Sequence, residues 1–248
     1  IKTNLNYFNN TIIGELDLSS GSTNYLTKLE FDDNKIYLYS EKKINQDHLY
    51  LANIDLNPFY ANLAINLNSI DFFDLIKKDG LFMKIISSNL INNKNLNYEL
   101  KFNSANLKNH RLLKNLMLKL NFQESKLNFD NSTIIFDENV NITLTNTNFV
   151  SKIDDAFFSG EVIFKIKNSD NLYKFFQTNK KYRKEIKEIK VSFKINLLDN
   201  SYSFEKVSID NQSNDQIQNV IKYYNKNSFN IFKRIEIKNL FNEIVSNL

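Results

Sequence analysis

The chain has 248 residues, of which 42% are hydrophobic, and this length can bury a sizeable core as a single all-β domain. The sequence contains no cysteine, which excludes a disulfide framework and thiolate metal sites. The formal net charge is only +4. The one basic cluster, at 180–188, also contains two Glu residues, so we predict a solvated connection there and no nucleic-acid partner.

Strand-like residues begin at the start of the chain, with Leu5 and Tyr7 followed by the apolar residues of 12–18. No run approaches the roughly 18 consecutive apolar residues of a membrane span, and no segment resembles a signal peptide. Since the sequence starts at Ile1 and is immediately strand-like, we expect a fragment of a longer protein, with its targeting or anchoring segment outside this chain.

Alternation of apolar and polar residues predicts strands along most of the chain. Clusters of Asn, Asp and Ser between them predict turns, because these side chains hydrogen-bond their own backbone and tolerate left-handed conformations. With only four Gly and one Pro, Asn is expected to replace Gly in the turns. The predicted strands lie at about 16–18, 28–31, 35–39, 49–56, 59–67, 94–103, 112–122, 126–129, 133–136, 139–145, 160–167, 187–198 and 201–209.

The alternation is strongest in three stretches, Leu96–Phe102, Leu116–Phe122 and Ile189–Leu197. Successive side chains of a strand point to opposite sides of the sheet, so each stretch has one apolar and one polar face. The fold class predicted from this pattern is mainly β. We expect a long, twisted and curved antiparallel sheet that is apolar on one side only and forms a groove.

Two short helical insertions are expected within the strands, near 69–79 and near 169–178. Asn68 or Ser69 can cap the first helix and Gly80 can end it. The second insertion begins with Ser169 and carries apolar residues on one face. Both helices are positioned to cover an end or an edge of the sheet.

The spacing of apolar residues changes after Asn211 and fits two amphipathic helices. The residues Ile235–Ile237 also fit a last strand, and this alternative stays open. We therefore predict an antiparallel β-groove domain at 1–210 and a helical C-terminal segment at 211–248.

One pattern of residues occurs twice with the same internal spacing, in Lys28–Leu38 and in Lys126–Phe136. In both copies a short strand runs into a polar tip and returns as a second strand, which predicts a repeated hairpin. A chance match within a low-complexity alternating sequence accounts for the pattern equally well.

The sequence offers little for catalysis or for a bound cofactor. The only His residues are His48 and His110, and each stands at the start of a predicted strand, where a surface position is the usual one. The Asp pairs at 32–33 and 154–155 lie in predicted turns and lack the spacing of a calcium loop. We predict that the chain is not an enzyme and has no catalytic residues, no metal site and no cofactor.

The order of elements between about 112 and 211 resembles the C-terminal region of AsmA-like proteins, a superfamily that includes TamB-like and YhdP-like members. The resemblance rests on the strand at Lys126–Asp130, the strand at Val140–Leu144, the strand that begins at Gly160–Phe164 and the paired strands near 187–209. It is a resemblance of pattern and not of one invariant motif.

The resemblance implies a protein of the Gram-negative envelope, anchored in the inner membrane and located in the periplasm. Members of this superfamily are thought to conduct phospholipids along an apolar groove toward the outer membrane. The expected partners are therefore phospholipid, a membrane reached through a segment missing from this fragment, and an envelope protein as a further candidate.

An apolar groove agrees with the alternating strands, because acyl chains need no directed hydrogen bonds. The same alternation also describes a closed β-sandwich or barrel whose dry face is core. In that alternative the chain is a structural or adhesive surface domain that binds a protein or a glycan. Its binding surface is the polar face, which includes Asn95, Asn97, Glu99 and Lys101. The predicted lipid-binding residues are Leu96, Tyr98, Leu100, Phe102, Leu116, Leu118, Leu120, Phe122, Val140, Ile142, Leu144, Val162, Phe164, Ile166, Val191, Phe193 and Ile195.

Overall fold

The fold is mainly β, as predicted, and its strands form a mixed sheet of 14 strands. The computed structural model divides into two compact units, unit 1 at Ile1–Asn128 and unit 2 at Phe129–Leu248. Within the described residues no second sheet covers the strands in the manner of a β-sandwich. The described residues are 2–8, 10–20, 23–40, 48–71, 93, 95–108, 110–124, 126–151, 156–196, 201–226 and 233–248.

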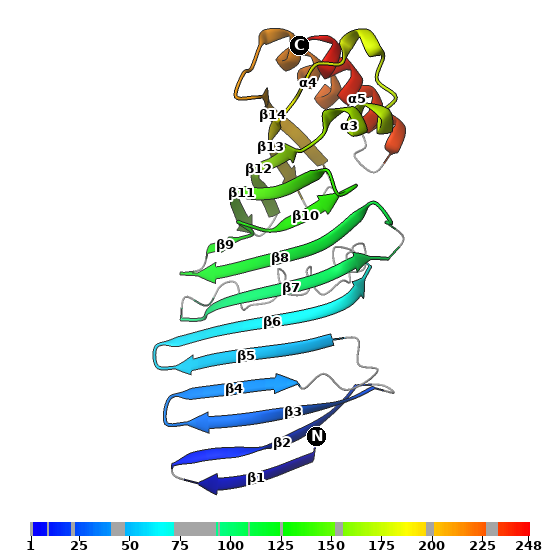
Figure 1. The fold of residues 1–248 in the computed structure, drawn as a ribbon. Helices are drawn as coiled ribbons and strands as arrows, with labels where there is room; N and C mark the ends of the chain where they lie inside the picture. The colour runs from blue at the N-terminus through cyan, green and yellow to red at the C-terminus, as the bar shows by residue number, and fades with distance from the viewer. Residues whose placement is uncertain are drawn as a thin grey trace. The chain divides into compact units, whose positions relative to one another are not determined.

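The described secondary structure of unit 1 consists of strands, which follow one another in the sheet in the order of the sequence (Figure 1). The strands are β1 (Lys2–Phe8), β2 (Thr11–Ser20), β3 (Thr23–Asp32), β4 (Lys35–Ser40), β5 (His48–Leu56), β6 (Phe59–Ile70), β7 (Asn97–Leu107), β8 (Leu113–Gln123) and the short β9 (Lys126–Asn128). From β4 onward the strands lie within about four residues of the predicted ranges, whereas β2 and β3 extend well beyond the predicted 16–18 and 28–31.

The prediction of a purely antiparallel sheet is wrong at one place, because β6 and β7 are parallel neighbours. Parallel strands need a long connection to return the chain to the same edge, whereas antiparallel strands can be joined by a tight turn. Alternation reports which face a residue occupies and does not report strand direction. A helix was predicted near 69–79, in the part of the sequence that connects β6 to β7. Ser69 and Ile70 belong to β6, and 72–79 lie outside the described residues.

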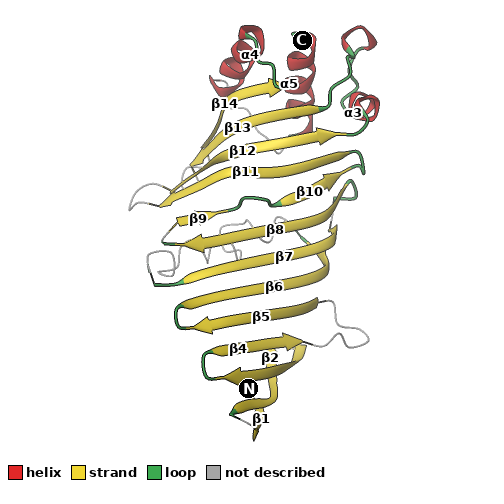
Figure 2. Cartoon of the chain, turned by 60° about the vertical axis from the view of Figure 1, so that its left-hand side comes forward, coloured by secondary structure: helices red, strands yellow, loops and turns green. Residues whose placement is uncertain are grey.

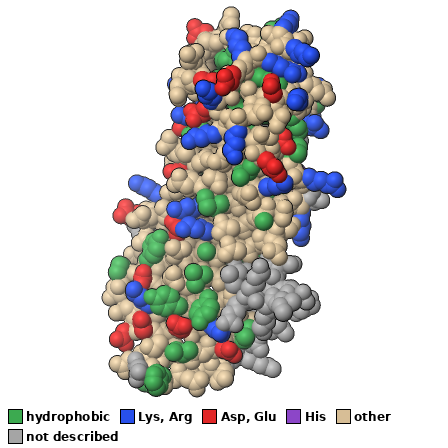
Figure 3. Space-filling view, viewed as in Figure 1, with side chains coloured by type: hydrophobic (Ala, Val, Ile, Leu, Met, Phe, Trp, Pro, Cys, Tyr) green, Lys and Arg blue, Asp and Glu red, His purple; other side chains and the backbone are tan. Residues whose placement is uncertain are grey.

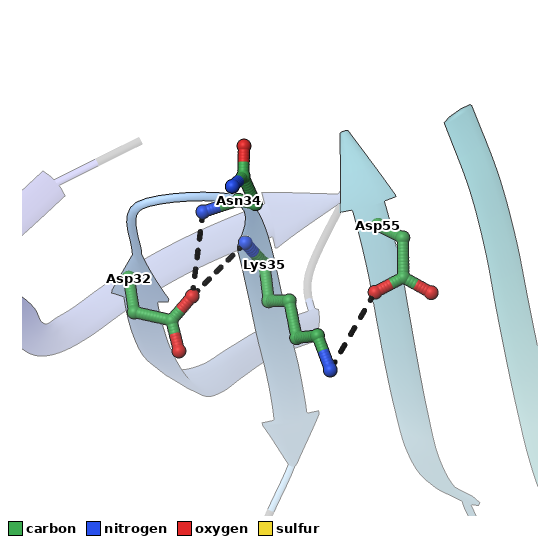
Figure 4. A network of polar contacts seen from close by, with 4 residues as sticks. All are labelled: Asp32, Asn34, Lys35 and Asp55. Atoms are coloured by element: carbon green, nitrogen blue, oxygen red, sulfur yellow. Dashed lines mark hydrogen bonds and ion pairs between the residues drawn. The ribbon is translucent and has the colours of Figure 1, made fainter. Parts of the chain in front are cut away.

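The turns of unit 1 use the predicted Asx chemistry. In the β3–β4 turn, the Asp32 carboxylate accepts hydrogen bonds from the backbone N–H groups of Asn34 at 3.4 Å and Lys35 at 3.1 Å (Figure 4). The Lys35 ammonium then reaches the Asp55 carboxylate of β5 at 3.9 Å.

In both units Asn also takes the backbone conformations expected for Gly. Among the described residues with positive φ are Asn10, Asn115, Asn131, Asn146 and Asn211.

Unit 2 combines strands with helices, and Figure 2 shows α3, α4 and α5 beside its last strands. The strands are ordered β10–β11–β12–β13–β14 and are antiparallel. Their bounds are β10 (Thr133–Phe136), β11 (Val140–Ser151), β12 (Ala156–Ile166), β13 (Glu188–Asn196) and β14 (Ser201–Ile209). The helices are α3 (Ser169–Phe175), the 3₁₀ helix η2 (Lys180–Tyr182), α4 (Asp215–Lys226) and α5 (Arg234–Ser246).

The repeated hairpin is correct for its first copy only. In that copy β3 and β4 pair directly, with Phe31 opposite Ile36. In the second copy β9 pairs with β8 and β10 pairs with β11, and the two are not partners of each other. The matching sequence therefore produces two different local structures, because strand pairing depends on neighbours outside the repeated segment.

The C-terminal helices share one core with the strands of unit 2. Val140, Ile166 and Val207 of the strands are buried in the same cluster as Ile221 of α4 and Phe241 of α5. The residues predicted as a separate segment at 211–248 thus belong to a unit that begins at Phe129, and residue 210 is not the boundary between the two units. The alternative of a last strand at 235–237 is wrong, because these residues lie in α5.

Candidate functional site

Unit 2 contains a cavity of about 660 Å³ between the apolar face of its strands and its helices. This volume is in the range of small-molecule sites, which are concave and mostly apolar. Among the described lining residues, only Tyr202, Ser203 and Arg234 carry a polar group. The lining is formed by Phe136, Val140, Ile142, Leu144, Phe158, Val162, Phe164, Leu172, Phe175, Phe176, Ile189, Val191, Phe193, Ile195, Tyr202, Ser203, Phe204, Val207, Ile221, Arg234, Ile237, Leu240, Phe241 and Ile244.

The strand registers explain why so many apolar residues meet on one side. Residues directly opposite in neighbouring strands share a face of the sheet. Three rows of residues cross β12, β13 and β14 in this way, and the first also includes β11. All members of these rows except Gly160 line the cavity. The rows are Leu144, Val162, Val191 and Val207, then Gly160, Phe193 and Phe204, then Phe158, Ile195 and Tyr202.

A β-bulge in β14 keeps its apolar residues on the cavity side. Ser192 pairs with Lys206 and Phe193 pairs with Phe204, so Glu205 is an extra residue. An extra residue reverses the alternation beyond it, and Phe204 and Val207 therefore face the same way. The backbone of Phe204 is bonded to α4, since its N–H donates to the Asn225 amide oxygen at 3.0 Å and its carbonyl accepts from the Asn225 amide nitrogen at 2.7 Å.

A second irregularity lies between β11 and β12, where Thr145 pairs with Glu161 and Asn148 pairs with Ser159. Here Thr147 packs against Gly160: a Cβ atom at Gly160 would lie 2.9 Å from the Thr147 methyl carbon. Thr147 is held by Asp130, whose carboxylate accepts from the Thr147 N–H at 2.7 Å and from its hydroxyl at 2.6 Å. Gly160 thus lets the backbone of β11 approach the cavity face of β12 closely.

Helices α3 and α5 form the opposite wall. The Asn168 side chain caps α3 by accepting from the Asp170 N–H at 2.9 Å, and this start directs Leu172 and Phe175 toward the cavity. The ring of Phe176 stacks on that of Phe241 in α5, with centroids 4.4 Å apart. The Asn242 amide of α5 donates to the Phe176 carbonyl at 3.0 Å, so the two helices are fixed to each other by apolar and polar contacts.

The described lining of the cavity contains no His and no carboxylate, and its one charged group is Arg234. The described residues also contain no group of three or more His, Asp and Glu side chains placed to hold a metal ion. Proton transfer and nucleophilic attack need such groups within hydrogen-bond reach of a substrate. The geometry of this site is therefore suited to holding an apolar molecule and offers no side-chain set for acid–base chemistry.

A second hollow in unit 2, of about 460 Å³, is polar and is lined by Glu185, Lys187, Glu188, Asp210 and Asn211. The Asp210 carboxylate there accepts from the backbone N–H groups of Lys187 at 2.9 Å and Glu188 at 2.8 Å. These bonds tie the start of β13 to the turn after β14. Asp210 therefore has a structural role in this hollow, because its carboxylate stabilises the turn after β14.

Unit 1 carries an apolar face that continues across β1 to β8. The registers connect Tyr7, Ile12, Phe31, Ile36 and Ile54 in one row from β1 to β5. A second row continues from Ala52 through Leu63 and Leu100 to Leu120.

The exposure of this face differs between its two ends. On β7 and β8 Phe102, Leu120 and Phe122 are buried, whereas Leu29, Phe31, Ile36 and Leu38 are only partly buried and Tyr7 is 72% exposed. Figure 3 shows hydrophobic side chains gathered over the N-terminal strands.

The opposite face of β7 and β8 is polar and holds a compact ion cluster. The Glu99 carboxylate lies 2.7 Å from the Lys101 ammonium and 2.9 Å from that of Lys119. Burial opposes ionisation of Glu99, but the hydrogen bonds and charges of the two lysines outweigh it and lower the pKa of Glu99. On the apolar face, burial raises the pKa of Tyr98, and no described residue forms a hydrogen bond with its hydroxyl.

The structure divides the predicted lipid-binding residues between the two units. Eight of them line the cavity of unit 2: Val140, Ile142, Leu144, Val162, Phe164, Val191, Phe193 and Ile195. Ile166 is buried in the core of the same unit. In unit 1, Leu96 lies just before β7. The predicted residues on the apolar face of β7 and β8 are Tyr98, Leu100, Phe102, Leu116, Leu118, Leu120 and Phe122. A single groove through all of these positions stays a prediction.

The sequence reasoning missed the helical half of the cavity and the lining residues of β14. Phe175, Leu240 and Phe241 lie on helix faces that the sequence pattern identifies as apolar. The pattern of one helix does not indicate which surface of the protein that face packs against. Phe204 and Val207 are three residues apart and break the period of two, so only the bulge at Glu205 reveals their common face. Arg234 has no sequence signal that separates it from other surface cations.

Comparison with known proteins gives no relative: no protein-family model, no curated protein and no solved structure matches the chain. None of the helices in the described part of the chain is long and apolar enough to cross a membrane.

Proposed function

We propose that this protein is a non-enzymatic lipid-binding protein that holds acyl chains against the apolar face of its β-sheet. The observation that carries the proposal is the cavity of about 660 Å³ in unit 2, whose described lining is apolar apart from three residues. A ligand that fills such a space must itself be almost entirely apolar, because a buried polar group without a partner is costly. Acyl chains meet this requirement.

The energetics are sufficient for useful affinity. Burial of hydrocarbon contributes about 0.8 kcal/mol per CH₂ group, so ten buried carbons contribute roughly 8 kcal/mol before the cost of ordering the ligand. No directed hydrogen bond is needed along the chain, and the binding is expected to discriminate weakly between chains of similar length.

The apolar face of unit 1 supports the same function. Its strands β3 and β4 present Leu29, Phe31, Ile36 and Leu38 only partly buried, whereas residues of a closed core are usually almost fully buried. A partly exposed apolar surface of this extent is typical of an interaction site for lipid or protein. Conduction of phospholipid between membranes, in a periplasmic protein held at the inner membrane, is the part of the proposal that rests on the AsmA-like pattern.

Site-specific photo-crosslinking tests the proposal. A photoreactive amino acid is placed at Ile195, which lines the cavity, and in a matched variant at Lys194, which is the next residue of β13 and faces the other side. Each variant is expressed in bacterial cells and irradiated, and bound lipid is identified by mass spectrometry.

We expect lipid adducts at position 195 and none above background at position 194. Equal labelling of both positions, or a protein that is free of lipid and labels only a protein partner, would contradict the proposal. The second result would favour the surface-domain alternative.

A further inference from the structure

The cavity of unit 2 has a charged group at one end. Arg234 is the first residue of α5, and its guanidinium carbon lies 4.7 Å from the centroid of the Phe175 ring. Phe175 packs edge-on against Phe136, with ring centroids 4.9 Å apart. Because Phe136 pairs with Val140 at the start of β11, the cation stands at the Phe136 end of the cavity wall. Phe158 and Ile195 lie toward the other end of the strands.

The surroundings of Arg234 leave its positive charge uncompensated. Among the described residues no carboxylate forms an ion pair with it, and the Glu236 carboxylate in the same turn pairs with Lys233 at 3.2 Å. Lys238, one turn further, donates a hydrogen bond to the Gln177 side chain at 2.5 Å. Among the described lining residues of α5, Arg234 is therefore the one charged group. It lies at the positive end of the helix dipole, which adds to its charge.

The length of the cavity wall suits one extended acyl chain. The lining residues of β12 extend from Phe158 to Phe164, which is roughly 20 Å at a rise of about 3.3 Å per residue. One leaflet of a bilayer gives an acyl chain about 15 Å, half of a hydrocarbon core about 30 Å thick. A chain that starts beside Arg234 can thus lie within the cavity along the strands.

We propose that the occupant of this cavity is a long-chain fatty acid, whose carboxylate pairs with Arg234 while its chain lies on the face of β11 to β14. The inference rests on the proposed lipid-binding function and adds the class of lipid. A guanidinium presents a planar pair of donors that matches one carboxylate. The described lining supplies no second cation and no other charged group, which suits a single negative charge better than the two charges of a phosphate monoester.

Titration calorimetry of the purified chain with three ligands of equal chain length tests the inference. The ligands are dodecanoate, dodecyl phosphate and the uncharged 1-dodecanol. The variants are Arg234→Gln, which removes the charge, and Arg234→Lys, which keeps the charge without the planar fork. Lys238→Gln is the matched control, because it removes a cation from the same helix and Lys238 is not among the lining residues of the cavity.

We expect the unaltered protein to bind dodecanoate at least tenfold more tightly than 1-dodecanol. Arg234→Gln should weaken dodecanoate binding about tenfold to a hundredfold, as expected for the loss of a charge-assisted pair. The variant should leave 1-dodecanol binding unchanged. Arg234→Lys should retain part of the affinity, and Lys238→Gln should change it less than about threefold.

Three outcomes would overturn the inference. The first is equal affinity for dodecanoate and 1-dodecanol. The second is an Arg234→Gln variant that binds dodecanoate as well as Lys238→Gln does. The third is a preference for dodecyl phosphate that Arg234→Gln removes, which would assign a phosphate head group instead. If no ligand binds, including 1-dodecanol, the proposed lipid-binding function itself fails, and this result is distinct from the other three.

Discussion

The two units contain the same kind of alternating strand and treat its apolar face differently. In unit 2 the helices α3, α4 and α5 cover that face and share a core with it, leaving a partly open cavity between them. In unit 1 the described residues contain strands only, and the face on β3 and β4 remains partly exposed. Period-two alternation thus specifies a face, and the elements that pack on it decide whether the face becomes core, cavity or surface.

The outermost strands of the two units differ in the same way. The edge of β14 is covered by α4: the Asn225 amide bonds the backbone of Phe204, and the Gln218 amide donates to the Val207 carbonyl at 2.8 Å. At β1, by contrast, Tyr7 and Phe8 are 72% and 67% exposed. Exposed edge strands pair readily with other chains, and the bonds from α4 oppose such pairing along β14.

The largest expected effect comes from placing a carboxylate on each apolar face. Phe193→Glu in unit 2 should destabilise the protein by about 4 kcal/mol, because Phe193 is 7% exposed and an unpaired buried charge is costly. Leu38→Glu in unit 1 should cost only about 1 kcal/mol, because a partly exposed carboxylate stays hydrated. Urea unfolding followed by circular dichroism measures both. Equal losses in the two variants would mean that the face of unit 1 is core as well.

A smaller effect is expected at the two glycines that allow strands to approach closely. Gly160→Ala should cost about 1–3 kcal/mol, because its Cβ atom would meet Thr147, which Asp130 holds in place. Gly14→Ala in unit 1 would place its Cβ atom against the Asn4 carbonyl oxygen and 2.9 Å from the Leu5 Cα atom of β1. Because backbone must move to relieve these contacts, a loss at least as large as that of Gly160→Ala is expected. Thermal melting of the two variants compares them, and an unchanged melting temperature for Gly14→Ala would contradict the close approach of β1 to β2.

The alkaline limit of stability should depend mainly on unit 2. Burial and then the hydrogen bond to Glu243 raise the pKa of Tyr224 to about 12, and burial raises the pKa of Tyr173. A raised pKa stabilises the folded state below pH 10, where tyrosine is neutral in both states, and this contribution is lost as the pH rises from about 10 to about 12. Chemical unfolding at a series of pH values should show the loss, and Tyr224→Phe should reduce it. A variant with an unchanged pH profile would contradict this assignment.

The smallest effect is expected at Tyr98 of unit 1. Its hydroxyl is buried and has no hydrogen-bond partner among the described residues, while its ring stacks on Phe122 with centroids 4.9 Å apart. Tyr98→Phe keeps the stacking and removes the unpaired hydroxyl, so stability should be unchanged or rise by up to about 1 kcal/mol. Tyr173→Phe in unit 2 is the matched comparison. It should destabilise the protein, because the Tyr173 hydroxyl donates to the Lys184 carbonyl at 2.5 Å. Denaturant midpoints of both variants decide whether the difference exists.

Much of the strand layout could be predicted from the sequence, because local alternation reports the face of each residue directly. The strands β5, β6 and β8 were predicted within a few residues, and so was helix α3. The parallel pairing of β6 with β7 could not be predicted, since the direction of a strand leaves no trace in its period. The prediction of a hairpin at Lys126–Phe136 was wrong because the strands that pair with β9 and β10 lie outside this segment.

The sequence by itself determined which residues avoid water. Eight residues chosen from the one-sided strands and the AsmA-like pattern line one cavity. The period of two that marks such strands is a property of the extended backbone and needs no knowledge of neighbours. Only the tertiary structure decided what that apolar face does. The bulge at Glu205 realigned β14, α3 and α5 closed the face into a cavity, and Arg234 came to stand beside Phe175. These outcomes depend on contacts between segments far apart in the chain, whose packing energies no local pattern contains.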